Sequence, residues 1–282
     1  MSSIPASTLT RKERHFFRSG GHTLYCSMHR GRRPNAPLIL FCNGFAQDHV
    51  FNWRAEVIGA GIVAERGYST FSYQARAHGD SSGDFESLRF ADLVDDAMAA
   101  ADEGLRCTGA SRIVWVGIRF GALVATAAMR ARRDTTALAL WEPAHRASDY
   151  FRALMRRVLF FEVSRGLRPS LTVDQMIEQL GAGNSVALLG FDLHPTFYLS
   201  AIEADLRNDL EQWRGPTLLA QIQRRSSLAR EHQQLQAVLE SRGGKVLTIL
   251  INEKPVWDDG IETWWTLEGL SSQMGDWLDG LA

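Results

Sequence analysis

The stretch Val116-Gly117-Ile118-Arg119-Phe120-Gly121-Ala122-Leu123 joins two segments of different character. The apolar run before it, at 112–116, is typical of a strand buried on both faces. The residues after it, at 120–132, have the apolar spacing of a helix. Glycines two positions before and two positions after Arg119 allow a strand to turn sharply into a helix, because glycine tolerates close backbone approach. The stretch therefore predicts a strand, a tight turn and a helix, with an arginine at the apex of the turn.

Strand-like runs alternate with helical patterns along most of the chain. The expected strands lie at 13–18, 23–28, 38–42, 69–73, 112–116, 137–141, 216–222 and 245–251. The expected helices lie at 53–66, 88–106, 120–132, 227–242 and 261–280. Gly20-Gly21 makes a hairpin of the first two strands. We therefore expect an α/β fold with an eight-stranded, mostly parallel sheet and helices on both of its faces.

The alternation stops between residues 145 and 214, where helical periodicity dominates and strand signals are weak. We expect this segment to be a helical cap inserted into a core formed by residues 1–144 and 215–282. An insertion above the carboxyl ends of the strands would form a lid over a site located there.

Composition excludes several classes of function. The 282 residues are 45% hydrophobic and 22% charged, and the formal net charge of −1 provides no basic face for nucleic acid. No apolar run is long enough for a signal peptide or a membrane span, so we expect a cytoplasmic protein. No glycine-rich nucleotide motif is present, and we expect no cofactor and a small-molecule partner. The sequence leaves the oligomeric state open.

The cysteines give no sign of a metal site or a disulfide framework. Cys26, Cys42 and Cys107 lie far apart and lack metal-ligand spacing, so we expect reduced, buried thiols and no metal.

Four motifs resemble the α/β-hydrolase fold, and the resemblance covers almost the whole chain. Residues 38–45 resemble its strand and oxyanion-hole turn, with Asn43-Gly44 where His-Gly is common. Trp53 is expected to begin the next helix, and 75–83 resembles the loop R-G-H-G-x-S-x-G. The frame 117–121 resembles the nucleophile elbow G-x-S-x-G. Their order and spacing imply this fold with a helical cap.

The catalytic residues that the resemblance would imply are missing. Arg119 takes the place of the serine, and a guanidinium that stays protonated cannot attack a carbonyl carbon. Residues 223–227 contain no carboxylate, and residues 252–260 contain no histidine. With all three positions changed, the ordinary acyl-enzyme mechanism is excluded.

A narrower resemblance rests on shorter motifs. The elbow GIRFGALVA, the run Leu-Trp-Glu-Pro at 140–143 and Pro-Val-Trp at 255–257 are similar to exosortase-associated hydrolases. They are also similar to hydrolase-fold enzymes of tetronate antibiotic biosynthesis, which eliminate acetate from an acetylated intermediate. This resemblance implies a carbon–oxygen lyase acting on a polyketide-type substrate.

Arg119 is expected to lie at the foot of a pocket rich in hydrogen-bond donors. The resemblance places the amides of Phe45 and Phe120, with Asn43 beside them, at the oxyanion hole. A guanidinium among these donors would bind an anion. Because a buried arginine needs a partner, either Glu142 or a carboxylate, enolate or ester oxygen of a ligand completes the pair.

Several residues are candidates for the remaining roles. His78 or Glu142 is the candidate base, although His78 would otherwise hold its own loop through a backbone bond. Asp192 and His194 would close over the ligand, or only cap a helix. The remaining candidates for the substrate pocket, each with ordinary core packing as its alternative, are Cys42 and Trp257.

Three functions are compatible with these residues. The leading hypothesis is a lyase that expels a carboxylate while Arg119 binds the developing anion. The second is an unconventional ester hydrolase or acyltransferase, with water activated by His78 or Glu142. The third is a non-catalytic binding protein that keeps the fold for its pocket or surface.

Overall fold

The computed structural model describes residues 12–188, 190–252, 255 and 267–281. Its centre is an eight-stranded sheet in the order β1-β2-β4-β3-β5-β6-β9-β10. The strands are β1 (Lys12–Ser19), β2 (His22–His29), β3 (Leu38–Cys42), β4 (Ser69–Tyr73), β5 (Ile113–Ile118), β6 (Thr135–Trp141), β9 (Thr217–Ile222) and β10 (Val246–Ile251). The hairpin β1–β2 is antiparallel and joins β4 antiparallel, whereas all the other pairings are parallel. The predicted fold class is confirmed.

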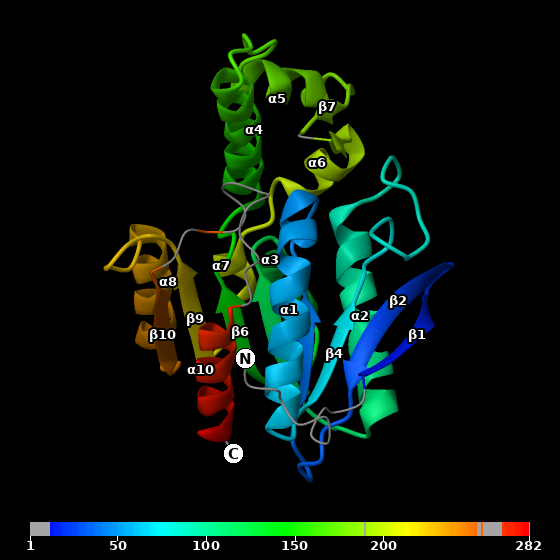
Figure 1. Cartoon of the computed structure of the whole chain (residues 1–282), viewed down its shortest axis with the longest axis vertical. Coiled ribbons are helices and arrows are strands. Elements are labelled where there is room, and N and C mark those ends of the chain that lie inside the picture. Colours follow the sequence, from blue (N-terminus) through cyan, green and yellow to red (C-terminus); the bar gives the residue numbers. More distant parts are fainter. Residues whose placement is uncertain (1–11, 189, 253–254, 256–266, 282) are drawn as a thin grey trace, which may run out of the picture.

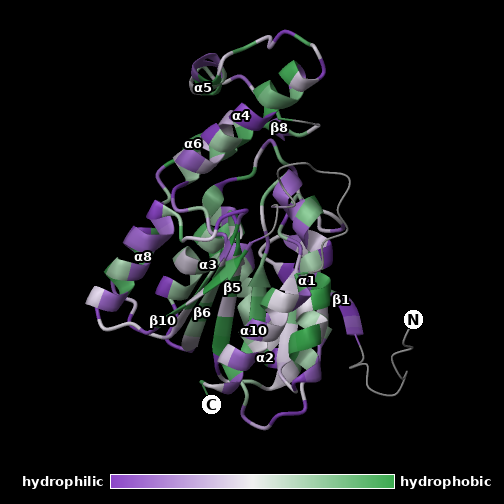
Figure 2. Cartoon of the chain, turned by 60° about the vertical axis from the view of Figure 1, so that its left-hand side comes forward, coloured by the Kyte–Doolittle hydropathy of each residue, from purple (hydrophilic) through white to green (hydrophobic). Residues whose placement is uncertain are grey.

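Helices cover both faces of the sheet, as the continuously apolar strands require (Figure 1). In β3, Leu38 and Leu40 face one hydrophobic cluster and Ile39 and Phe41 face the other. The first cluster receives α2 (Phe90–Thr108), α3 (Gly121–Arg130) and α8 (Arg230–Ser241), and the second receives α1 (Gln47–Glu65) and α10 (Glu268–Asp279). Figure 2 shows β5 as a hydrophobic strand at the centre of the molecule.

The segment 145–214 contains α4 (Ala147–Ser164), α5 (Val173–Gly181), the short strands β7 (Val186–Ala187) and β8 (Asp192–Leu193), α6 (Pro195–Ala201) and α7 (Leu206–Asp209). Most of it, from α4 to α6, stands beyond one end of the sheet, whereas α7 lies beside α3 (Figure 1). Tyr150 and Phe151 on α4 and Phe197 on α6 are buried and join the first hydrophobic cluster. The segment is therefore packed onto the strand ends through aromatic side chains.

Within the described ranges, every helix is too short or too polar to cross a lipid bilayer.

Two local predictions need correction. Helix α1 begins at Gln47, so Trp53 lies inside it and is half exposed instead of starting it. The earlier start follows from a turn at Ala46, whose φ of 52° lets the chain enter the helix directly after the oxyanion-hole turn. The expectation of three buried thiols also fails at Cys107, which is partly exposed, while Cys26 and Cys42 are buried and all three are free.

Candidate active site

The predicted turn is present between β5 and α3, with Arg119 at its apex. Arg119 has a φ of 54°, a left-handed conformation that a side chain rarely adopts. Its amide donates to the carbonyl of Trp141 over 3.0 Å. A Cβ on Gly121 would lie 2.2 Å from the carbonyl oxygen of Cys42, and one on Gly117 would lie 2.5 Å from the Cα of Ala122. Both glycines are thus required by the turn.

The Arg119 side chain is 14% exposed and bonds to groups of the protein that include Asp48 and Glu142. Its Nε donates to Asp48 Oδ2 over 3.2 Å, and its Nη1 donates to the backbone carbonyl of Glu142 over 3.3 Å. Its guanidinium carbon also lies 5.8 Å from the centre of the Tyr150 ring. Burial lowers the pKa of Arg119, but the nearby Asp48 carboxylate, with Tyr150 and Glu142, more than offsets this, so the pKa is raised.

Asp48 is the acidic residue that the sequence did not reveal. It is fully buried in the first turn of α1 and accepts bonds from Arg119, from Arg157 Nη2 over 3.0 Å and from the Tyr150 hydroxyl over 2.9 Å. The expectation that Glu142 or a ligand alone completes the arginine pair is therefore corrected, because Asp48 is a third partner. Its separation of 71 residues from Arg119 leaves no local pattern in the sequence.

Glu142 lies at the end of β6, at a φ of 42°, and its carboxylate faces the neighbouring strand. That carboxylate accepts from the amide of Ile222 and from the side-chain amide of Gln223. His232 Nε2 lies 3.9 Å from Glu142 Oε1. The residue reaches Arg119 through its backbone carbonyl, so it is part of the same site.

A pair of buried histidines lies next to Glu142. His145 Nε2 and His232 Nδ1 are 3.0 Å apart. Burial lowers the pKa of His145 to about 3, with His232 and Arg207 adding to the effect. Burial likewise lowers the pKa of His232 to about 4, and Arg119 contributes to the same shift. Both imidazoles are consequently neutral near pH 7. The sequence contains no local signal for this pair, because 87 residues separate its members.

A large cavity, called here the arginine-lined pocket, opens beside Arg119. Its volume is about 500 Å³, and it lies among the start of α4, the ends of β6 and β9, and the start of α8. Its charged and titratable lining residues are Arg119, Glu142, His145, Arg146, Asp149, Arg152, Arg156, Arg225, Arg230, Glu231 and His232. Six arginines against three acidic residues favour an anionic ligand. A pocket of this size accommodates a drug-sized molecule.

The arginines of this pocket differ in their partners. Arg146 pairs with Asp205 over 2.9 Å, and Arg152 pairs with Asp174 over 3.2 Å. For Arg156, Arg225 and Arg230, the described part of the chain contains no ion-pair partner within 4.0 Å. Their charge is directed at solvent or at a ligand.

A second region, called here the aromatic-filled region, occupies the oxyanion-hole side of the elbow. The ring of Phe45 stacks on Phe197 with centroids 4.3 Å apart and contacts Phe191 at 5.3 Å and Phe120 at 5.4 Å. The remaining cavity measures about 20 Å³, which is room for about one water. Its lining includes Cys42, Asn43, Phe45, His78 and Phe120.

Two predicted site residues in this region are engaged locally. His78 Nδ1 lies 2.9 Å from the backbone carbonyl of Arg76. His78 therefore holds its own loop, which was the alternative to a role as the base. Burial lowers the pKa of His78, and the bond to Arg76 opposes that shift. Burial raises the pKa of Cys42 to about 12, so its thiol is protonated near neutrality and cannot act as a thiolate. Neither residue lines the arginine-lined pocket.

The other predicted residues lie apart from Arg119. Asn43 donates to the carbonyl of Tyr73 over 3.1 Å. Asp192 is exposed in β8, and His194 precedes α6 with its Nδ1 2.9 Å from Ser185 Oγ. Neither Asp192 nor His194 lines either cavity as described. Trp257 lies outside the described residues.

Comparison with known proteins agrees with this fold and places the chain in a family. The serine aminopeptidase, S33, family matches residues 33–190, which is more than half of the chain. The chain belongs to this family. Comparison with the curated proteins gives no match.

Solved structures share the fold at low sequence identity. Est1E from Butyrivibrio proteoclasticus, in a structure with ferulic acid bound, has a TM-score of 0.68 and 17% identity, covering 95% of this chain and 98% of its own. An esterase from Pyrococcus furiosus has a TM-score of 0.66 and 15% identity, covering 100% and 94%. Mouse alpha/beta hydrolase domain-containing protein 10 has a TM-score of 0.63 and 16% identity, covering 96% and 100%. These similarities establish the α/β-hydrolase fold.

Proposed function

We propose that the chain is an enzyme that binds an acylated, anionic small molecule in the arginine-lined pocket and eliminates a carboxylate from it. The observation that carries the proposal is the position of Arg119. It occupies the place of the nucleophile and lines a cavity of about 500 Å³ with five further arginines. A fixed cation that cannot attack suits a reaction in which negative charge develops and leaves.

The elimination can be written with the groups that line the pocket. A base removes a proton from the carbon next to a carbonyl, and the electrons of that C–H bond form a carbon–carbon double bond. The bond between the adjacent substrate carbon and the ester oxygen breaks, and its electron pair leaves with that oxygen as acetate or another carboxylate. Arg119 receives the developing anion, a contribution of about 3 kcal/mol to the barrier.

His232 is the base in this proposal, in place of His78. Its neutral state at pH 7 allows it to accept a proton, and Glu142 3.9 Å away would compensate the charge of the imidazolium. His145 fixes the ring of His232 through the other ring nitrogen. His78 is set aside because it lies in the aromatic-filled region.

Ester hydrolysis is the second candidate, and the family and the esterase neighbours favour it. The same histidine pair would activate water for attack on the acyl carbonyl. Arg119 would then stabilise the tetrahedral oxyanion, with no covalent intermediate on the enzyme. The substrate loses its acyl group in both reactions, but hydrolysis leaves an alcohol and elimination leaves an alkene.

Product analysis tests the proposal. An O-acetylated tetronate is the first substrate, because the motifs of the elbow and of 140–143 resemble the acetate-eliminating group. We expect the purified chain to release free acetate and an exocyclic alkene, both detected by mass spectrometry, and Arg119→Ala to release neither. Arg14→Ala, an exposed change on β1, is the matched control and should behave as wild type.

Each other outcome has a definite meaning. Acetate together with the alcohol would replace the lyase assignment by the hydrolase. No product from a panel of acylated analogues, despite saturable binding, would assign the chain as a binding protein.

A further inference from the structure

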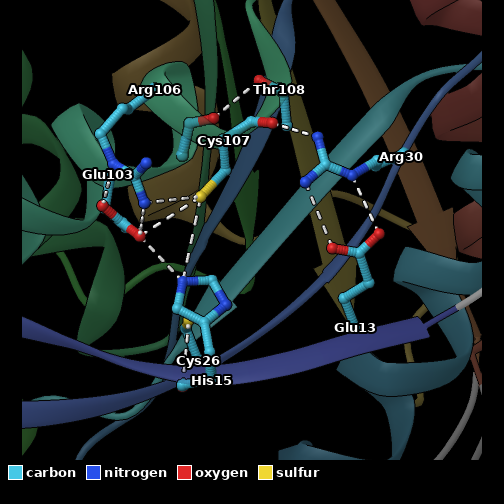
Figure 3. A network of polar contacts seen from close by, with 9 residues as sticks. Glu13, His15, Cys26, Arg30, Glu103, Arg106, Cys107 and Thr108 are labelled. Atoms are coloured by element: carbon cyan, nitrogen blue, oxygen red, sulfur yellow. Dashed lines mark hydrogen bonds and ion pairs between the residues drawn. The ribbon is translucent and has the colours of Figure 1, made fainter.

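A separate cluster of metal-ligating side chains lies where α2 packs against the edge strand β1 (Figure 3). His15 comes from β1, while Glu103 and Cys107 lie one helical turn apart on α2. Residues four apart project from the same face of a helix, so both point at the strand. Neither β1 nor α2 contributes a described residue to the arginine-lined pocket, so the cluster is independent of the proposed function.

We propose that His15 Nε2, Glu103 Oε1 and Cys107 Sγ bind a zinc ion, with water as the fourth ligand. The sequence shows no metal-ligand spacing for this group, because His15 and Glu103 are 88 residues apart. The fold brings the three ligand atoms to within 4.8 Å of one another. In Figure 3 the three side chains converge on one point between the strand and the helix.

The spacing of the three atoms is close to that of a tetrahedral site. The N–O distance between His15 and Glu103 is 2.8 Å, the S–O distance between Cys107 and Glu103 is 3.2 Å, and the S–N distance between Cys107 and His15 is 3.9 Å. Tetrahedral zinc with ordinary bond lengths holds such pairs about 3.3, 3.6 and 3.6 Å apart. Side-chain shifts of about half an ångström would therefore admit the ion.

The donor set selects the kind of metal. One thiolate, one imidazole and one carboxylate suit zinc and similar transition ions, whereas magnesium and calcium prefer oxygen ligands. The side chain of His15 is 32% exposed and that of Glu103 is 14% exposed, so solvent reaches the cluster. Binding releases the Cys107 proton to the solvent, since only the thiolate ligates the ion.

Two arginines flank the cluster and must coexist with the ion. Arg106 donates from Nε to Glu103 Oε2 over 2.8 Å and from Nη2 to Oε1 over 2.6 Å. Its side chain is 70% exposed, so it can leave Oε1 to the metal and keep its bond to Oε2. Arg30 is paired with Glu13 and donates to the backbone carbonyl of Cys107, so it does not bond to the thiol; Arg106 Nη2 does, over 3.3 Å to Cys107 Sγ, and must release it to the ion (Figure 3). Arg106 is the direct competitor of the metal.

Titration of the metal-free full chain with Co²⁺ tests the proposal. We expect one equivalent to bind with the near-ultraviolet charge-transfer absorbance of a cobalt–thiolate bond, and Zn²⁺ to displace it. Cys107→Ser should abolish that absorbance, and His15→Gln should weaken binding at least tenfold, as loss of a ligand does. Cys42→Ser, which removes a buried thiol elsewhere, is the matched control and should bind as wild type.

A variant with increased affinity is also needed, because misfolding could explain a loss of binding but not a gain. Arg106→Ala removes the competing cation, so we expect it to bind Co²⁺ several-fold more tightly than wild type. The proposal is overturned if no thiolate band appears up to millimolar Co²⁺, or if the band persists in Cys107→Ser. Tighter binding in Arg106→Ala together with loss in Cys107→Ser would establish the three-residue site.

Discussion

The two sides of the elbow have opposite character. Phe120 packs into the aromatic-filled region, where about 20 Å³ is left, whereas its neighbour Arg119 lines a pocket of about 500 Å³. One side is closed by stacked rings from α4 and α6, and the other is rich in arginine and histidine. The comparison shows that the chain retains the turn of the nucleophile elbow without retaining an open cavity on its oxyanion-hole side. The backbone that usually presents a nucleophile here presents a cation, and the usable space lies toward β6, β9 and α8.

The largest effect is expected from opening the aromatic-filled region. Phe45→Ala should lower the free energy of unfolding by about 4 kcal/mol, because it removes a buried ring that contacts several others. The half-exposed Phe16→Ala is the control and should have little effect. Denaturant unfolding measures both variants. If Phe45→Ala abolished turnover without a loss of stability, the substrate would belong in the aromatic-filled region instead.

The pH dependence of stability should report two buried groups with opposite effects, Glu56 on α1 and His232 in the lining of the arginine-lined pocket. Burial raises the pKa of Glu56 from 4.5 to about 7, although Ser72 and Asn43 oppose the shift. The folded state therefore holds a proton that the unfolded chain releases near pH 4.5, and stability falls by about 3 kcal/mol as pH rises from 4.5 to 7. His232 acts in the opposite sense. Its pKa falls from 6.5 to about 4, so stability falls by a similar amount as pH drops through this range.

Two variants resolve these opposing slopes. In Glu56→Gln, the free energy of unfolding should rise with pH between 4.5 and 6.5, because only the histidine term is left. In His232→Asn, the rise with pH should become shallower without reversing, because buried His145 and His49, whose pKa values are lowered to about 3 and about 4, still oppose Glu56. Unfolding curves at half-unit pH steps measure the slopes. Profiles parallel to wild type in both variants would contradict the assigned pKa shifts.

Arg119→Lys should reduce kcat/KM about 100-fold, equivalent to about 3 kcal/mol. An ammonium keeps the charge but cannot bond to Asp48 and at the same time present a planar fork to the ligand. Arg157→Lys is the matched control, since Arg157 shares Asp48 and is not among the residues lining the pocket as described. Steady-state kinetics with the acetylated substrate compares them. Equal losses in both variants would assign Arg119 a purely structural role.

The smallest effect is expected at the rim of the arginine-lined pocket. Arg225 is exposed and lines the pocket, so Arg225→Ala should raise KM about fivefold, or about 1 kcal/mol, with kcat unchanged. The difference should shrink in 0.5 M salt, since exposed charges are screened. Arg165→Ala, at the end of α4 and outside the pocket lining, is the control. A KM that changes neither in Arg225→Ala nor with salt would show that the pocket does not bind its ligand as an anion.

The fold was predictable because its signals are local. The strands at 38–42 and 69–73 have the same bounds in sequence and structure, and the other six sheet strands differ by one or two residues at their ends. A continuous apolar run identifies a strand covered on both faces, wherever it lies in the chain. The start of α1 was missed because the turn at Ala46 has no sequence signal of its own.

The site was predictable at the elbow and at Glu142, which directly follows a recognisable strand. Gly117, Arg119 and Gly121 are adjacent in the chain, so their turn could be read directly. Asp48 and the pair His145–His232 are assembled by packing across 71 and 87 residues, which a single sequence does not encode locally. The aromatic rings that fill the oxyanion-hole side also come from distant helices, so their packing has no local signal in the sequence.

The most direct test is a crystal structure with an acylated tetronate whose scissile ester oxygen is replaced by a methylene group, so that no carboxylate can leave. We predict that its acyl carbonyl oxygen lies within hydrogen-bond distance of Arg119 and that the ligand occupies the arginine-lined pocket, near His232. A ligand seated beside Phe45 and Phe120, with Arg119 bonded only to Asp48 and Glu142, would contradict the account.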